Sequence, residues 1–154
     1  MTAARPDFVD RLLAPAPAIC TGRGCALGVM VLRVAAGAVI AGFGIGKFTR
    51  HAAEAVALDR YGIPWADPVT YLVGALELGG GALLVLGLLT RPVALALTAN
   101  LAVAIATAGR LEGGPIHLGV APALLATMLL LLVTGGGPVS LDGLLLARRR
   151  QRRA

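Results

Sequence analysis

Two ionisable residues that could carry out chemistry, Arg33 and Glu77, lie inside long apolar stretches of the sequence. A charge near the centre of a bilayer costs roughly 2.5 kcal/mol or more, so such residues usually face the interior of a helix bundle and mark function. Asn100 is a third polar residue in such a stretch. These residue types predict a polar site inside a membrane, with Glu77 as the candidate proton acceptor.

The composition indicates the class of protein that must position this site. The chain of 154 residues is 57% hydrophobic and only 14% charged, whereas about a quarter of the residues in an ordinary soluble domain are charged. A transmembrane helix needs about 20 mainly apolar residues. Four segments meet this requirement, at about 26–46, 69–89, 93–108 and 118–134. We therefore expect an all-α membrane protein, a four-transmembrane-helix bundle over residues 26–146.

The basic residues predict an orientation, because cytoplasmic ends of membrane proteins are enriched in arginine and lysine. An even number of spans places both termini and the turn at Arg91 on the same side, and most arginines belong to that side. We expect an inner (plasma) membrane protein with a cytoplasmic N-terminal segment over 1–25, no cleavable signal peptide, and a basic cytoplasmic tail over 147–154. The tail should contact anionic lipid rather than nucleic acid.

Small residues surround each polar residue of the predicted spans. Counting about 1.5 Å per residue from the cytoplasmic edge places Arg33 roughly 10 Å, Asn100 roughly 12 Å and Glu77 roughly 18 Å deep. We therefore expect these three side chains to meet, although an Arg33–Glu77 ion pair could serve only to fix helix register. The small neighbours are Ala36 and Gly37 after Arg33, Gly74, Gly80 and Gly81 around Glu77, and Ala96 and Ala104 around Asn100. Ala38, Gly42 and Gly46 form a small-residue stripe in the first span that should allow close approach of another helix.

The longest connection, from Lys47 to Pro68, should lie on the extracytoplasmic side. Its portion over 49–60 mixes small apolar residues with charges, which is typical of an interfacial helix lying on the membrane. The aromatic residues over 61–65 suit an interfacial belt better than a binding site. His51 and His117 are the only histidines, and without a third ligand at helical spacing we assign no metal site to them.

Cys20 and Cys25 are the only cysteines, and they are candidate redox thiols. Their spacing matches neither a CxxC redox motif nor a zinc-binding pattern. A reducing cytoplasm also disfavours a permanent disulfide. Incidental thiols and a reversible disulfide therefore both stay open.

Several motifs together resemble the DoxX family. They are Leu32-Arg33, Gly37, Gly44 and Lys47-Phe48 in the first span, Gly62-Ile63-Pro64, the run from Tyr71 to Pro92 that contains Glu77 and Thr90-Arg91-Pro92, and Ser140-Leu141-Asp142. The resemblance implies a compact four-helix membrane bundle with recurrent polar residues at Arg33, Lys47, Glu77 and Arg91. It also implies an association with quinol-linked or thiosulfate-linked oxidoreductase complexes. Phe43 stands where many relatives have histidine, which weakens a proton-transfer role at that position.

Three classes of function follow, and the first is our leading expectation. It is a small membrane subunit of a quinone- or thiol-linked oxidoreductase system, at most an accessory subunit rather than an independent enzyme. We expect no covalently bound cofactor, a quinone as candidate ligand, and a membrane or cytoplasmic oxidoreductase partner. The alternatives are a small-solute or proton transporter or channel, and a membrane scaffold; a homo-oligomer is compatible with each. The candidate ligand-binding residues are Arg33, Lys47, Glu77, Asn100 and Arg91.

Overall fold

The structure is a computed structural model that describes residues 22–153. Cys20 and most of the expected N-terminal segment lie outside the described residues. Every regular element within 22–153 is a helix, and four of these stretches are long and apolar enough to cross a membrane, as the sequence predicts. The elements are α2 Arg23–Thr49, α3 His51–Arg60, α4 Ala66–Leu86, α5 Thr90–Ala106, α6 Ala108–Leu111, η1 Ile116–Val120, α7 Ala121–Thr134 and α8 Leu141–Arg153.

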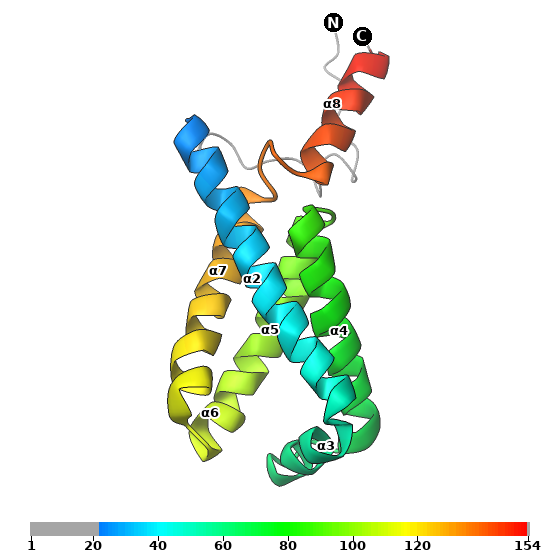
Figure 1. The fold of residues 1–154 in the computed structure, drawn as a ribbon. Coiled ribbons are helices and arrows are strands. Elements are labelled where there is room, and N and C mark those ends of the chain that lie inside the picture. The colour runs from blue at the N-terminus through cyan, green and yellow to red at the C-terminus, as the bar shows by residue number, and fades with distance from the viewer. Residues whose placement is uncertain (1–21, 154) are drawn as a thin grey trace, which may run out of the picture.

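The spans form two helix pairs, with α2 packed on α4 and α5 packed on α7 (Figure 1). The short helix α3 connects α2 to α4 at one end of the bundle, which we call the α3 end. The α4–α5 turn, the loop over 135–140 and α8 lie at the opposite end, the α8 end. The two pairs diverge toward the α3 end in Figure 1. Helix α8 includes most of the basic tail that we expect over 147–154.

Glycines bring α2 and α4 into backbone contact. A methyl group added at Gly44 would lie 2.5 Å from the backbone nitrogen of Leu78, and one added at Gly81 would lie 2.5 Å from the carbonyl oxygen of Gly37. Small residues allow this close approach between membrane helices. The prediction of a stripe through Gly42 was wrong, because Gly42 is exposed and nothing would lie within 4 Å of a methyl group there.

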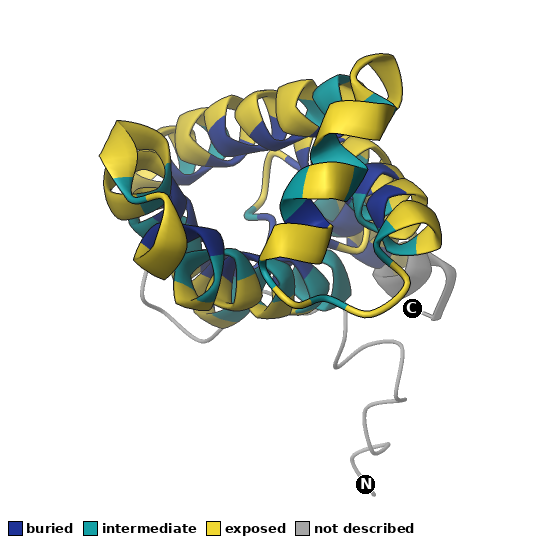
Figure 2. Ribbon diagram, turned by 90° about the horizontal axis from the view of Figure 1, so that it is seen from below, coloured by how far each residue is buried: buried dark blue, intermediate teal, exposed yellow. Residues whose placement is uncertain are grey.

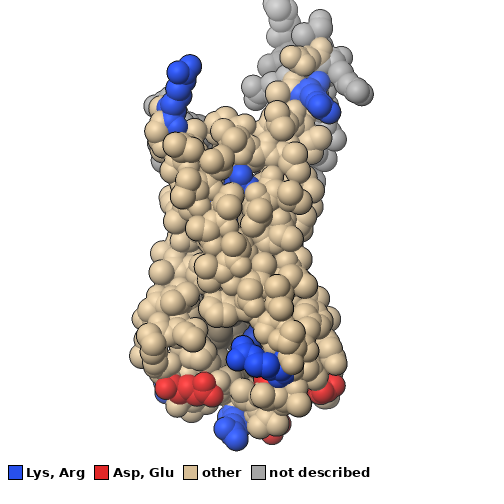
Figure 3. Space-filling model, in the orientation of Figure 1, with Lys and Arg blue, Asp and Glu red and all other residues tan. Residues whose placement is uncertain are grey.

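Figure 2 shows the buried residues where the helices face one another and the exposed residues on the outer side of the bundle. The core contains Ile40, Leu84, Leu97, Met128 and Leu131, one or more from each spanning stretch. On the outer surface, Leu72 is 69% exposed, and Leu95 and Val133 are also exposed. Figure 3 shows one face on which charged side chains gather near the two ends and leave an uncharged belt between them. This surface suits hydrocarbon rather than water.

Candidate functional site

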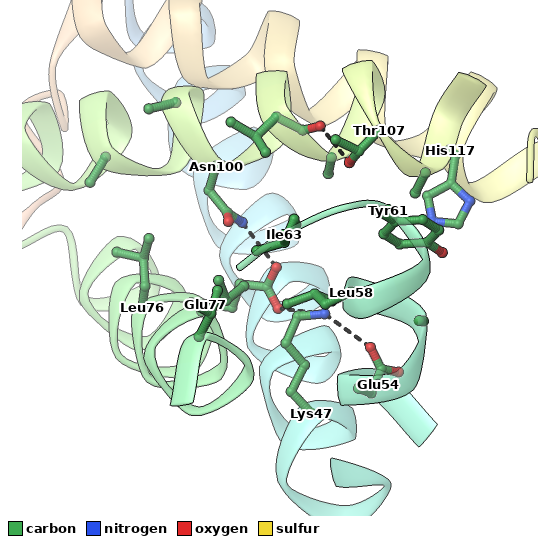
Figure 4. A pocket seen from close by; sticks show the side chains of 18 residues that line it. Lys47, Glu54, Leu58, Tyr61, Ile63, Leu76, Glu77, Asn100, Thr107 and His117 are labelled. Atoms are coloured by element: carbon green, nitrogen blue, oxygen red, sulfur yellow. Dashed lines mark hydrogen bonds and ion pairs between the residues drawn. The ribbon is translucent and has the colours of Figure 1, made fainter. Parts of the chain in front are cut away.

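Three of the expected polar residues meet near the α3 end of the bundle (Figure 4). The amide nitrogen of Asn100, on α5, donates a 3.0 Å hydrogen bond to Glu77 Oε1, on α4. The ammonium group of Lys47, on α2, lies 3.9 Å from Glu77 Oε2. Glycines at positions 74, 80 and 81 share the buried face of α4 with Glu77, as expected from the sequence. Three spanning helices thus position one carboxylate.

The short helix α3 adds a second carboxylate to this group. Lys47 Nζ lies 3.2 Å from Glu54 Oε2, and Arg50 Nη2 lies 3.9 Å from Glu54 Oε1. The side chain of Arg50 is 72% exposed, so this row of charges runs from the interior at Glu77 to the surface of the α3 end. Glu54 was read from the sequence only as an acid of an interfacial helix, since its contact with Lys47 depends on how α3 folds back.

A cavity of about 470 Å³ lies beside Glu77, and a second of about 360 Å³ adjoins it. Both are lined by Lys47, Glu54, Tyr61, Glu77 and His117, while most other lining residues are apolar. Cavities of this size with apolar walls and a few convergent polar groups are typical of small-molecule sites. Tyr61 and His117 therefore belong to the cavity, in contrast to the aromatic belt and the solvated loop that their sequence positions suggested.

Tyr61 lines the cavity, and its hydroxyl remains protonated well above neutral pH. Desolvation, followed by the hydrogen bond to Glu112 and the negative charge of that residue, raises the pKa of Tyr61 to about 12. A phenol with this pKa remains a hydrogen-bond donor throughout the neutral range. Tyr61 thus connects the α3 side of the cavity to the loop that precedes η1.

One carboxylate oxygen in the cavity has no hydrogen-bond partner. Glu77 is only 8% exposed, and its Oε2 atom is buried without a donor within hydrogen-bond distance. Lys47 is too far away, at 3.9 Å, to donate a normal hydrogen bond to this oxygen. Buried polar atoms are nearly always satisfied. The oxygen can accept a hydrogen bond from a hydroxyl or amine of a bound molecule.

Arg33 does not join this group, so the expected meeting of Arg33 with Glu77 was wrong. Arg33 is 2% exposed, and its guanidinium donates to the backbone carbonyls of Leu84 and Val85, the latter at 3.1 Å. It also donates to the carbonyl of Val139 at 3.1 Å. The side chain therefore satisfies the C-terminal end of α4, where unpaired carbonyls and the helix dipole favour a positive charge.

Asp142 completes this structure at the α8 end. Its carboxylate is 3% exposed and accepts hydrogen bonds from the backbone nitrogens of Leu89 and Thr90, at 2.8 and 2.9 Å. It thereby caps α5 from a distant part of the chain and lies near enough to attract Arg33. A methyl group at Gly87, whose φ is +70°, would clash with Arg33 Nη1. We call Arg33, Gly87 and Asp142 the clasp.

Arg91 and the cysteines also lie away from the cavity. Arg91 donates to the carbonyl of Val133 at 3.0 Å, which links the start of α5 to the end of α7 at the α8 end. Cys25 lies in the first turn of α2 and is not a free thiol. At a rise of about 1.5 Å per residue, Lys47 lies about 33 Å from Cys25 along the axis of α2. The cavity and the cysteine thus occupy opposite ends of the same helix.

The remaining histidine, His51, locks α3 against α4. Its Nε2 lies 2.8 Å from Asp67 Oδ1, and its ring stacks on Tyr71 with centroids 3.8 Å apart. No group of three or more histidine, cysteine, aspartate or glutamate side chains within the described residues is placed to hold a metal ion. The stacking could not be foreseen from the sequence, because it requires the reversal of the chain between α3 and α4.

The comparison with protein families supports the resemblance drawn from the motifs. The family model described as DoxX matches residues 28–110, which include Lys47, Glu77, Asn100, Arg33 and Arg91. The match ends before His117 and Asp142. No curated protein and no solved structure matches the chain.

Proposed function

Since the chain belongs to the DoxX family, we propose that it is a small membrane subunit of a quinone-linked oxidoreductase system, and that it binds a quinone or quinol beside Glu77. The observation that supports this proposal is the Oε2 atom of Glu77, which lacks a hydrogen-bond donor in a largely apolar cavity. A buried acceptor of this kind is costly unless a ligand donates to it. An independent enzyme is not part of the proposal, because electrons must pass to or from a partner oxidoreductase.

The residues that line the cavity fit a quinone head group. Asn100 and Lys47 carry N–H groups that can donate to a carbonyl oxygen, and Glu77 can accept from a hydroxyl. The volume of about 470 Å³ falls in the range of roughly 300–1,000 Å³ for small-molecule sites. A bound quinone would supply reversible two-electron, two-proton chemistry. The apolar walls over the rest of the cavity match the hydrocarbon portion of such a molecule.

Each polar residue has a separate role in this proposal. Glu77 accepts the hydrogen bond, and then the proton, of a quinol hydroxyl. Lys47, 3.9 Å from Glu77 Oε2 and 3.2 Å from Glu54, connects the Glu77 carboxylate to the exposed α3 end. Asn100 fixes the orientation of the carboxylate through its hydrogen bond to Oε1. Arg33 and Arg91, which we had expected at this site, instead stabilise the α8 end.

We further propose that the protein lies in an inner membrane with the α8 end on the cytoplasmic side. The charged residues of the α8 end include Arg23, Arg91 and Arg148, with Asp142 as a buried acid. The α3 end carries acids as well as bases, among them Glu54, Asp59, Asp67 and Glu112. This asymmetry follows the enrichment of positive charge at cytoplasmic ends. The cavity would then open toward the extracytoplasmic half of the bilayer.

The clasp supports ligand binding, rather than solute transport, as the function of the bundle. Arg33, Gly87 and Asp142 are buried at the α8 end and connect α2, α4, α5 and α8 through hydrogen bonds to the backbone. A solute path through one subunit would have to open this end, which costs several buried hydrogen bonds. The thiol-linked and scaffold alternatives have no comparable support, since neither uses the buried Glu77.

Quinone titration of the purified protein in detergent tests the proposal. Wild type and an Asp59→Asn variant should bind ubiquinone or menaquinone with similar dissociation constants, because Asp59 is an exposed acid of α3. A Glu77→Gln variant should bind a quinol at least tenfold more weakly, since the acceptor charge is lost. Equal binding by the Glu77→Gln and Asp59→Asn variants would contradict the role of Glu77. Absence of quinone and quinol binding by folded wild type would contradict the proposed function.

A further inference from the structure

Some of the residues that line the larger cavity also lie on the outer surface of the bundle. On one side they consist of Val69, Val73 and Leu76 of α4, and on the other they include Ala99 and Val103 of α5. Val103 is 54% exposed, and Ala99 is exposed as well. Since these exposed residues of α5 also line the cavity, the cavity reaches the lipid-facing surface beside α5, and α4, which belongs to the other helix pair, lines its opposite wall.

The side of the cavity near water is more polar and is covered by α3. Glu54, Ala57 and Leu58 of α3 line the cavity, and Leu58 is 8% exposed. The Lys47–Glu54 pair and the His51–Asp67 contact hold α3 against α2 and α4. Figure 4 shows Glu54, Leu58 and Tyr61 on one side of Glu77, and Leu76 and Asn100 on another. A molecule arriving from water would have to pass these charged groups.

We infer that the ligand enters sideways from the bilayer, between α4 and α5, with its polar head at Glu77 and a hydrocarbon tail along the cleft that these two helices line. This inference rests on the proposed function and narrows its ligand to a membrane-dissolved amphiphile with a tail. The Glu77 Oε2 atom, which is buried and has no hydrogen-bond donor, marks the position of the head. The apolar side chains that lead from it to the lipid-facing surface mark the path of the tail.

The opposite side of the bundle is less suited to this path. The second cavity, of about 360 Å³, reaches toward α2 and α7 and is lined there by Phe43 and Leu124. Arg50 and Glu112 also line it, so a hydrocarbon tail would meet charged groups. Apart from Glu77 and Asn100 at the proposed head position, the lining residues of α4 and α5 are small or branched apolar ones, with Ala96 and Ala104 added to those named above. The α4–α5 cleft is therefore the route that we assign.

Tryptophan quenching tests the path without any knowledge of the ligand. Trp65 is the only tryptophan, so a Trp65→Phe background allows one reporter to be placed at will. In vesicles of lipid brominated on the acyl chain, the Leu76→Trp variant should lose at least half as much fluorescence as the exposed control Leu72→Trp. Strong quenching of Leu72→Trp with none of Leu76→Trp would overturn the lateral path. So would quenching of Leu76→Trp by aqueous acrylamide but not by brominated lipid.

A narrowed cleft tests the path with a ligand. The Ala99→Phe variant should weaken binding of a quinone with a long isoprenoid tail at least tenfold and leave binding of the tailless benzoquinone unchanged. Ala102 is exposed on the same helix but does not line the cavity, so Ala102→Phe should bind both as wild type does. Equal effects of Ala99→Phe on both quinones, or no effect, would overturn the inference. If wild type binds neither quinone, the proposed function fails, while lipid quenching still decides the path.

Discussion

At the scale of single residues, hydrogen bonding distinguishes two kinds of buried carboxylate. Glu77 has one oxygen without a hydrogen-bond partner and lies in a cavity, whereas the Asp142 carboxylate accepts two backbone hydrogen bonds. The first arrangement leaves binding capacity for a ligand, and the second is satisfied within the protein. Arg33 lies with Asp142 at the α8 end, although in the sequence it stands inside an apolar stretch as Glu77 does. Burial of a charge alone thus does not identify a ligand site.

The clasp should contribute to stability and not to ligand binding. An Asp142→Ala variant leaves two backbone N–H groups without their acceptor and removes the negative charge near the buried Arg33. We expect its free energy of unfolding in mild detergent to fall by about 3 kcal/mol. An Asp59→Ala variant removes an exposed acid and should change it by less than about 0.5 kcal/mol. Similar stabilities for these two variants would show that Asp142 does not hold the α8 end together.

The proton of Tyr61 gives a prediction of pH dependence. Because the folded state raises the pKa of Tyr61 from its ordinary value of about 10 to about 12, its contribution to stability is complete below about pH 10. That contribution should be lost as the pH rises toward about 12, so wild type should lose stability relative to Tyr61→Phe over this interval. The measurement is unfolding of both variants across the interval. Parallel stability curves would contradict the hydrogen-bonded phenol.

At the scale of helices, one face of α2 determines how closely the first two spans pack. A side chain at Gly44 would overlap backbone atoms of α4, whereas nothing would lie within 4 Å of a methyl group at Gly42. A Gly44→Ala variant should therefore be destabilised by about 1–3 kcal/mol. Gly42→Ala should be neutral or stabilised by up to about 1 kcal/mol, since alanine favours the helix. Thermal unfolding of the two variants provides the comparison, and a more stable Gly44→Ala protein would contradict the observed packing.

The sequence predicts the helices better than their rotations. The four spans and the small-residue faces around Glu77 and Asn100 follow from hydropathy and spacing, and the structure confirms the spans. The contact face of α2 does not follow from the sequence, because α2 has several stripes of small residues. Only the packing against α4 shows that Gly37 and Gly44 form the contact. The partner of Arg33 could not be predicted either. It depends on the return of the chain at Val139, after the last span.

At the scale of the whole molecule, the two ends of the bundle have different constructions. The α8 end is closed by buried hydrogen bonds, whereas the α3 end contains adjoining cavities covered by a short helix. This asymmetry suits a protein that takes up a ligand in one half of the bilayer. The side of the membrane on which each end lies can be measured.

Labelling of single cysteines tests the proposed orientation. In a Cys20→Ser/Cys25→Ser background, Asp59→Cys places a thiol on exposed α3, and Gln151→Cys places one on α8. A membrane-impermeant maleimide added to spheroplasts should label the Asp59→Cys variant directly and the Gln151→Cys variant only after permeabilisation. The reverse pattern would place the cavity in the cytoplasmic half of the membrane.

The central claim is that Glu77 holds a membrane-dissolved ligand, and its most direct test is mass spectrometry of the protein extracted in mild detergent. Wild type and Asp59→Asn should each carry a quinone, close to one per chain, and Glu77→Gln should lose it while remaining folded. A quinone retained equally by all three proteins, or absent from folded wild type, would contradict the claim.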